Sequence, residues 1–466
     1  MKNLKMTVPF VSISGTILLL LAMSFTAANL AAEEPEWQKP TLPDRVASDK
    51  TTEGPIGTIH RTRYIRTDRA GSAAVLIHFY RGTGLVREEY LTLQPSSDIY
   101  ITPRRRVSMD NGKTWSEWET LPEEEMVQNG CYKAVYFFTE QQMNPACHKV
   151  ARIILQRIFD KDIRQKQPSY PRYWDHSVIE LSDDDGKTFT SSRLVSYEPG
   201  ADFDPADWLK EEYLENNASY CGHSFITEPN GDILFSAIAS VPLEEENTTV
   251  GGVRFFRGHW NEEEQRFDWE NPSSFGVSTK VSGRGLIEPF LVRLSDGTLY
   301  IDMRGSTDHQ PAGVEGLADP HHWYSISHDN GQTWERVTDL KFDTGESFWS
   351  PSSFAKLIRS SQTGKLYWVG NISLDSKPSG NWPRFPLYIA EFDEEKVALK
   401  KDTLTLIDTR EDADISSNVQ FSNFSLIENR ETGTLEIFLT RYGERGDSSD
   451  ADYYEADTFK YEVTLK

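Results

Sequence analysis

The chain has 466 residues, 38% of them hydrophobic and 12% aromatic, and carries a formal net charge of −23. This content of apolar and aromatic residues supports an extensive core and excludes a disordered segment. The acidic excess repels nucleic acid and anionic membranes at long range, so neither is an expected partner. An anionic ligand would need a local cluster of arginines that reverses the field at short range.

The N-terminus has the order of a secretory signal. Lys2 and Lys5 precede an apolar run over residues 17–23, and small alanines follow up to Ala32. We therefore predict a signal peptide over residues 1–32, an N-terminal extension over 33–54 and a domain over 55–466. The mature protein is expected to be secreted or periplasmic, without stable membrane insertion.

Cysteine use excludes a disulfide scaffold. The chain has three cysteines, Cys131, Cys147 and Cys221, and at most one bridge is expected, for which Cys131 and Cys147 are candidates. No set of Cys and His has the spacing of zinc ligands. The sequence predicts no metal site and no cofactor.

An octapeptide with the pattern Ser-x-Asp-x-Gly-x-Thr-aromatic occurs three times, at residues 108–115, 182–189 and 327–334. Its Asp can accept turn amides, its Gly permits positive φ, and its aromatic residue packs beneath a hairpin. The first two copies start 74 residues apart and the last two 145 apart, about twice that distance, which indicates that one repeat has lost its box. Residues 258–269 and 390–399 fit as degenerate hairpins.

A second repeated element consists of two apolar strands joined by a turn. It occurs in residues 222–237, 285–305, 350–371 and 421–441, and residues 62–81 and 131–157 fit the same scheme. About six four-stranded units result. We predict an all-β fold, a six-bladed β-propeller with Asp-box hairpins, because a two-sheet sandwich does not explain the long period.

With these boxes the chain resembles the sialidase superfamily, whose propellers carry Asp boxes on outer hairpins and a site on the axis. Within residues 286–304, Glu288 and Arg304 match the family's paired glutamate and second arginine. Arg384 lies where the third arginine is expected, and Arg61 or Arg63 where the first is expected. The resemblance implies an arginine cluster that binds a sugar carboxylate through charge-assisted hydrogen bonds.

The resemblance also implies a tyrosine nucleophile activated by a glutamate, here Glu288, and an aspartate as acid/base, for which Asp98 is the candidate. At the expected nucleophile position stands Phe421, which has no hydroxyl. Independently of the family, propeller geometry places Asn423 and Arg441 at strand ends that face the central opening. His223 lies on such an end too, near Tyr220, and can serve as a base beside a uronate carboxylate.

These residues predict a secreted exo-glycosidase that acts on a terminal acidic sugar, such as sialic acid. The predicted catalytic residues are Glu288, His223 and Asp98, and the predicted substrate-binding residues are Arg61, Arg63, Arg304, Arg384, Asn423 and Arg441. Two alternatives stay open: a lyase or hydrolase for uronate-containing polysaccharide, and a glycan-binding propeller without catalysis.

Overall fold

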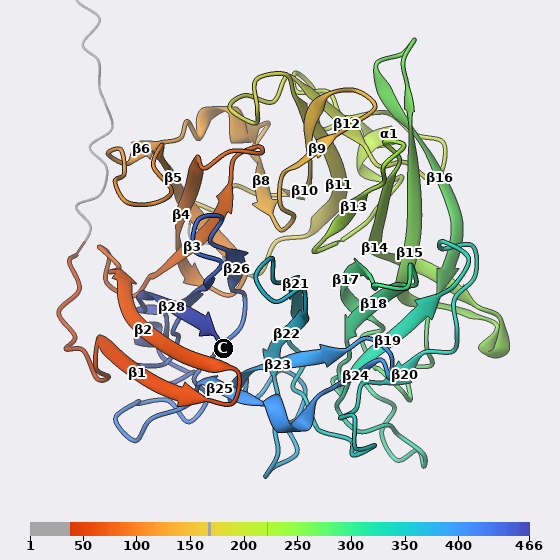
Figure 1. Cartoon of the computed structure of the whole chain (residues 1–466). Coiled ribbons are helices and arrows are strands. Elements are labelled where there is room, and N and C mark those ends of the chain that lie inside the picture. Colours follow the sequence, from red (N-terminus) through yellow and green to blue (C-terminus); the bar gives the residue numbers. More distant parts are fainter. Residues whose placement is uncertain (1–37, 166–168, 221) are drawn as a thin grey trace, which may run out of the picture. The chain divides into compact units, whose positions relative to one another are not determined.

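Six antiparallel sheets surround a common axis in the part of the chain that the structure describes, residues 38–165, 169–220 and 222–466 of a computed structural model (Figure 1). The predicted signal peptide lies outside the described residues. Within the sheets the strands follow one another largely in chain order, so each sheet is a meander and forms one blade. The predicted six-bladed β-propeller is confirmed.

The first three blades come from the N-terminal half of the chain. The first contains β3 (Ala73–Tyr80), β4 (Arg87–Ser96), β5 (Ile99–Ser108) and β6 (Glu119–Thr120). The second contains β7 (Val127–Gln128), β8 (Cys131–Phe137), β9 (Gln142–Asn144), β10 (Lys149–Phe159), β11 (Tyr173–Ser182) and β12 (Ser191–Leu194). The third contains β13 (Phe225–Thr227), β14 (Ile233–Leu243), β15 (Thr248–Asn261) and β16 (Arg266–Phe275).

The remaining blades follow in order. The fourth contains β17 (Ile287–Arg293), β18 (Leu299–Arg304), β19 (His322–Ser327) and β20 (Thr338–Asp339). The fifth contains β21 (Lys356–Arg359), β22 (Leu366–Asn371), β23 (Leu387–Asp393), β24 (Ala398–Leu399) and β25 (Thr405–Asp408). Short helices are confined to connections: α1 (Glu211–Leu214), and the 3₁₀ turns η1 (Glu124–Met126), η2 (Glu244–Glu246), η3 (Lys401–Thr403) and η4 (Ala451–Tyr454).

The sixth blade joins the two ends of the described chain. C-terminal strands β26 (Ser425–Glu428), β27 (Leu435–Thr440) and β28 (Thr458–Leu465) continue into β2 (Gly57–Ile65) and β1 (Asp49–Gly54). Ile59 pairs with Val463 across this seam. The blade thus includes residues 49–54, which were predicted to belong to an N-terminal extension.

The predicted pairing of residues 62–81 as an inner hairpin is wrong. This segment spans the end of β2, in the sixth blade, and all of β3, in the first blade, and the two strands belong to different sheets. β3 pairs with β4 instead, from Ala73 opposite Gln94 to Tyr80 opposite Arg87. The apolar pattern of two successive strands does not reveal that a blade boundary lies between them.

The three Asp boxes lie in the outer hairpins of their blades, at β5–β6, β11–β12 and β19–β20. In the first box, Asp110 accepts hydrogen bonds from the Thr114 amide at 2.8 Å and the Thr114 hydroxyl at 2.6 Å. Gly112 has a φ of 84°, and its amide donates to the Ser108 hydroxyl at 2.8 Å. The predicted degenerate hairpins occupy the same place as β15–β16 and β23–β24.

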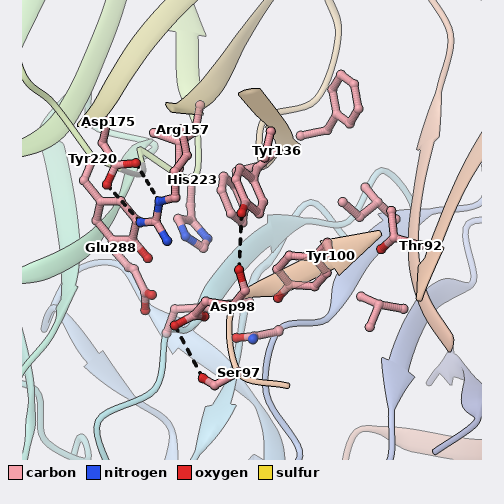
Figure 2. A pocket seen from close by; sticks show the side chains of 18 of the residues that line it. Thr92, Ser97, Asp98, Tyr100, Tyr136, Arg157, Asp175, Tyr220, His223 and Glu288 are labelled. Atoms are coloured by element: carbon pink, nitrogen blue, oxygen red, sulfur yellow. Dashed lines mark hydrogen bonds and ion pairs between the residues drawn. The ribbon is translucent and has the colours of Figure 1, made fainter. Parts of the chain in front are cut away.

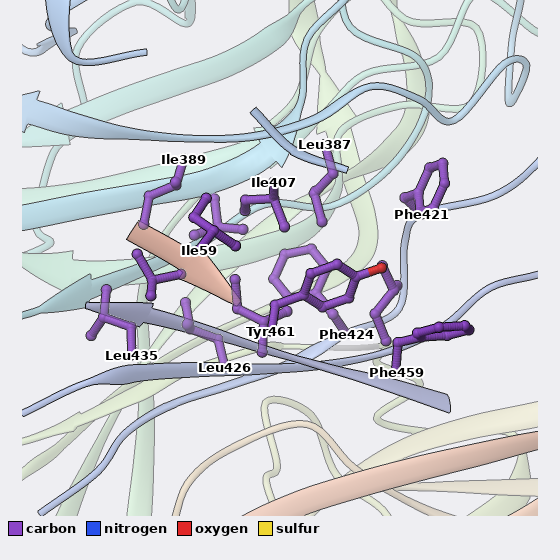
Figure 3. Close-up of a cluster of buried hydrophobic side chains, with 14 of the residues drawn as sticks. Ile59, Leu387, Ile389, Ile407, Phe421, Phe424, Leu426, Leu435, Phe459 and Tyr461 are labelled. Carbon is purple, nitrogen blue, oxygen red and sulfur yellow. The ribbon is translucent and has the colours of Figure 1, made fainter. Parts of the chain in front are cut away.

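Apolar side chains fill the spaces between neighbouring blades. The largest cluster lies between the fifth and sixth blades and includes Ile59, Leu387, Phe421, Leu435 and Tyr461 (Figure 3). It holds β2 against the C-terminal strands and the fifth blade. Hydrophobic packing therefore closes the ring together with the strand pairing.

Candidate functional site

A cavity of about 590 Å³ opens on the propeller axis and is lined by residues of all six blades. The lining side chains come from the starts of the first strands, the connections between second and third strands, and the segments between blades. These positions lie at one end of the blades because successive turns in a meander alternate between ends. The predicted residues Asp98, His223, Glu288, Arg304 and Arg384 all line this cavity, as does Asn423.

Two buried arginines form one side of the cavity. Arg304 ends β18, and Arg384 lies in the β22–β23 connection. Both guanidinium groups donate to the Asn381 side-chain oxygen, Arg304 at 3.2 Å and Arg384 at 3.0 Å. Burial and the charge of Arg304 lower the pKa of Arg384 to about 10. The pair is therefore held together against its own repulsion, an arrangement that an anion would stabilise.

Glu288 is directed into the cavity by an irregular backbone. The β17–β18 register shifts between Ile287 and Phe290, and Glu288 has a φ of 53°, a left-handed conformation that costs an L-residue about 1 kcal/mol or more. Its carboxylate accepts a hydrogen bond from Arg304 at 2.7 Å. Burial alone would raise the pKa of Glu288, but the charge of Arg304 and its hydrogen bond to the carboxylate lower it. Glu288 is thus an ionised carboxylate.

His223 is buried beside this pair. Its ring stacks on Phe138 at 4.8 Å and contacts Phe354 at 4.5 Å between centroids. Burial lowers its pKa to about 3, and Glu288 opposes this shift only in part. The imidazole is therefore neutral at physiological pH but too weakly basic to remove a carbon-bound proton efficiently.

Asp98 lies in the short β4–β5 turn with a φ of 58°. Its carbonyl accepts a hydrogen bond from the Tyr136 hydroxyl at 3.5 Å, and Ser97 donates to its carboxylate at 3.4 Å (Figure 2). Burial opposes a raised pKa of Arg304, but Glu288 raises it, and the charge of Asp98 makes a smaller contribution in the same direction.

The second blade supplies a different wall. Arg157, at the end of β10, donates to both carboxylate oxygens of Asp175, at the start of β11, at 2.7 and 2.9 Å. The guanidinium lies 4.1 Å from the ring centre of Tyr173 and 5.3 Å from that of Tyr220. Figure 2 shows this ion pair beside Tyr220 and His223.

Three predicted substrate-binding arginines are not among the residues that line the cavity. Arg61 and Arg441 both pair with Asp408 at 3.0 Å, and Arg63 pairs with Glu444 at 3.1 Å. The reason is topological for Arg61 and Arg63: β2 is the fourth strand outward in the sixth blade, whereas the sequence reasoning placed it at the axis. Arg441 follows β27, and its charge is taken up by Asp408 and Asp414 inside the blade.

Phe421, at the position expected for the nucleophile, is fully buried in the cluster between the fifth and sixth blades (Figure 3). Arg441 lies 4.8 Å from its ring centre. This position is thus part of the core and does not line the cavity. Tyrosines do line the cavity elsewhere: Tyr100, Tyr132, Tyr136, Tyr173, Tyr220 and Tyr454.

Sequence reasoning missed several charged and polar residues of the site. Arg157, Asp175, Arg284, Lys356 and Asn381 line the cavity. Two of them carried a local signal, since Arg284 precedes Glu288 by four residues and Asn381 precedes Arg384 by three. The lining as a whole has five cationic side chains and three carboxylates, so the site reverses the sign of the chain's net charge.

Cys131 and Cys147, the candidates for a bridge, are both free thiols. Among the described residues, no group of three or more His, Cys, Asp or Glu side chains is arranged to hold a metal ion. No helix in the same part of the chain has the length and hydropathy needed to cross a membrane.

Comparison with known proteins gives a family signature and several structures. The BNR/Asp-box repeat matches residues 325–336, around the third box. No curated protein sequence matches the chain. A protein of unknown function from Dyadobacter fermentans is similar with a TM-score of 0.54 and 13% identity, over 90% of this chain and 100% of that one.

The NanB sialidase of Streptococcus pneumoniae, in its K499G form, is similar with a TM-score of 0.52 and 13% identity, over 88% of this chain and 70% of that one. Its complex with a substituted ethanesulfonate gives a TM-score of 0.51 and 14% identity, over 92% and 71%. At identities this low, the structural similarity establishes the fold alone, and the chemistry has to be inferred from the residues of the site. With its six blades and Asp boxes, the chain has a propeller fold similar to that of the NanB sialidase.

Proposed function

We propose that this protein is an exported glycoside hydrolase that removes a terminal acidic sugar from a glycan. The observation that carries the proposal is the buried pair Arg304 and Arg384, joined by Asn381 in a cavity with more cationic than anionic groups. Two guanidinium groups held at one point suit a carboxylate. Export rests on the N-terminal signal pattern alone.

In the proposed reaction, Arg304 and Arg384 bind the sugar carboxylate and orient the anomeric carbon. We assign the nucleophile to Tyr220, because its ring contacts the Arg157 guanidinium and its charge also acts on Arg304. Cationic groups beside a hydroxyl stabilise the negative charge that develops on its oxygen during attack. By contrast, burial raises the pKa of Tyr100 and of Tyr136 well above the usual value.

The proton and bond changes balance within the cavity. The Tyr220 oxygen attacks the anomeric carbon while Glu288 accepts its proton, and Asp98 protonates the departing glycosidic oxygen. Asp98, now ionised, then takes a proton from a water that attacks the same carbon, and Tyr220 leaves and recovers its proton from Glu288. His223 serves as a neutral packing group.

The test is the mass of the products formed from a mixed panel of sialylated glycans and uronate polysaccharides. We expect products that have gained one water per cleaved bond. Glu288→Gln and Tyr220→Phe should each lower kcat about a hundredfold or more relative to the wild-type protein. Unsaturated fragments without added water would overturn hydrolysis in favour of elimination. Binding without turnover in the wild-type protein would favour the glycan-binding propeller.

A further inference from the structure

Asn381 lies in a tight turn of the β22–β23 connection, over residues 379–382. The first and last residues of this turn are joined by two backbone hydrogen bonds, at 2.8 and 3.0 Å. Gly380 has a φ of 52°, a left-handed conformation that favours glycine, and its amide donates to the Thr307 hydroxyl at 2.8 Å. Its carbonyl accepts a hydrogen bond from the Ser352 amide at 2.8 Å. The turn is therefore anchored on two neighbouring segments, and it places Asn381 in the lining of the cavity.

The chemistry of its neighbours fixes the orientation of the Asn381 carboxamide. Guanidinium groups donate hydrogen bonds and cannot accept them, so the atom that Arg304 and Arg384 both contact is the side-chain oxygen. The nitrogen of the same carboxamide therefore points away from the two guanidinium groups. Among the described residues it has no hydrogen-bond acceptor, and the side chain is only half-buried. The nitrogen is thus a donor that a ligand in the cavity can use.

The arginine pair has too few open donors to satisfy a carboxylate by itself. The two guanidinium groups carry ten N–H donors in total. Arg304 uses three of its five on oxygens of the described residues. Arg384 uses four, two of them on the Ser352 carbonyl. Three N–H groups therefore remain for a ligand, whereas a carboxylate has about four lone-pair sites, so one site is left without a guanidinium donor.

We propose that Asn381 completes the anion site: its oxygen holds Arg304 and Arg384 together, and its nitrogen donates the fourth hydrogen bond to the carboxylate of the terminal sugar. The inference rests on the proposed function for the identity of the anion. Arg61 and Arg63, the candidates for a third arginine, pair with carboxylates away from the cavity. A neutral donor suits this place, because burial and repulsion from Arg304 already lower the pKa of Arg384, and a third charge would increase that repulsion.

Two variants separate the two roles of Asn381. Asn381→Asp keeps an oxygen between the guanidinium groups but has no N–H, so the melting temperature should not fall, while the dissociation constant of sialic acid should rise about a hundredfold or more. Asn381→Leu removes both contacts, so the melting temperature should fall as well. Scanning calorimetry and titration calorimetry measure these changes. An Asn381→Asp variant that binds sialic acid as tightly as the wild-type protein would overturn the proposal.

The added charge of Asn381→Asp also weakens anion binding, so donation itself is measured in the wild-type protein. The NMR resonances of the Asn381 side-chain NH2 group are identified by their loss in this variant. Saturation with sialic acid should slow their exchange with water about tenfold or more, because one N–H becomes bonded to the carboxylate. Lactose, which is neutral, should leave the rate unchanged. An exchange rate that sialic acid does not change would overturn the proposal, even if the protein cleaves sialylated glycans.

Acetate separates this proposal from the proposed function, because it offers the same carboxylate without a sugar. If the protein binds neither sialic acid nor a uronic acid, acetate should still slow the exchange of the Asn381 NH2 group, and acetamide, which is neutral, should not. This result would support the anion site and refute the proposed substrate. In such a protein, an exchange rate that acetate does not change would refute the anion site as well.

Discussion

Replacement of Asp408 by Asn is expected to weaken the closure of the propeller without changing the active site. Asp408 accepts hydrogen bonds from Arg61, from Arg441 and from the hydroxyl of Tyr461. Arg61 is 2% exposed and Arg441 is fully buried, so neither guanidinium can regain water when the carboxylate charge is removed. Asn has almost the same volume, so the change isolates the loss of charge.

Removing one partner of a buried ion pair costs about 3–5 kcal/mol, which is an upper limit here because Arg61 still pairs with Glu411 and Arg441 with Asp414. For a folded unit of about 430 residues, the entropy of unfolding is roughly 0.9 kcal/mol per kelvin, so the melting temperature should fall by at most about 3–6 °C. Scanning calorimetry measures this shift. Asp68→Asn is the matched control, because Asp68 pairs with Arg104 at the surface and is expected to contribute at most about 1 kcal/mol.

The same variant decides between two roles for Arg61 and Arg441. If they close the ring, Asp408→Asn lowers the melting temperature and leaves KM for an acidic substrate within twofold. An unchanged melting temperature together with a raised KM would refute the structural role and return both arginines to the substrate site.

Two further predictions concern buried aromatic positions. Because the pKa of His223 falls from 6.5 to about 3 on folding, the unfolded chain binds a proton more tightly, and the free energy of unfolding should decrease by about 3 kcal/mol between neutral pH and pH 4. His223→Phe should remove this loss, as measured by denaturant unfolding at both pH values. An unchanged pH dependence in the variant would contradict the role of His223. Phe421→Tyr restores the hydroxyl that the family pattern expects but buries it in the core, so the free energy of unfolding should fall by about 1–3 kcal/mol. No gain in kcat is expected. A gain in kcat would contradict the assignment of the nucleophile to Tyr220.

The parts of the fold that were predictable are those fixed by local contacts. Each Asp box closes within eight residues through bonds such as that between Asp110 and Thr114, so its sequence suffices to define it. The seam of the sixth blade depends on pairs such as Ile59 with Val463, about four hundred residues apart. No local pattern in β2 reveals that partner, and for this reason Arg61 and Arg63 were misplaced.

The same distinction applies to the site. Glu288 and Arg304 were predictable as neighbours, because they lie on one hairpin whose register pairs Ile287 with Arg304. Arg157 and Asp175 also face each other across one hairpin, β10–β11. They were missed because an Arg and an Asp at facing positions are equally typical of a surface ion pair. Only the closure of the ring places that hairpin end at the cavity.

Strand direction explains why the Asp boxes, the strongest signal in the sequence, do not specify the reaction. β5 connects Asp98, in the turn before it, with the first box, in the turn after it. A strand of ten residues spans roughly 33 Å, so the box lies at the opposite end of the blade from the cavity. The boxes therefore fix the outer hairpins while the other end of each blade is free to vary in charge. On this chain that end supplies Arg304 and Arg384 from two blades, and the proposed acidic substrate is inferred from those side chains.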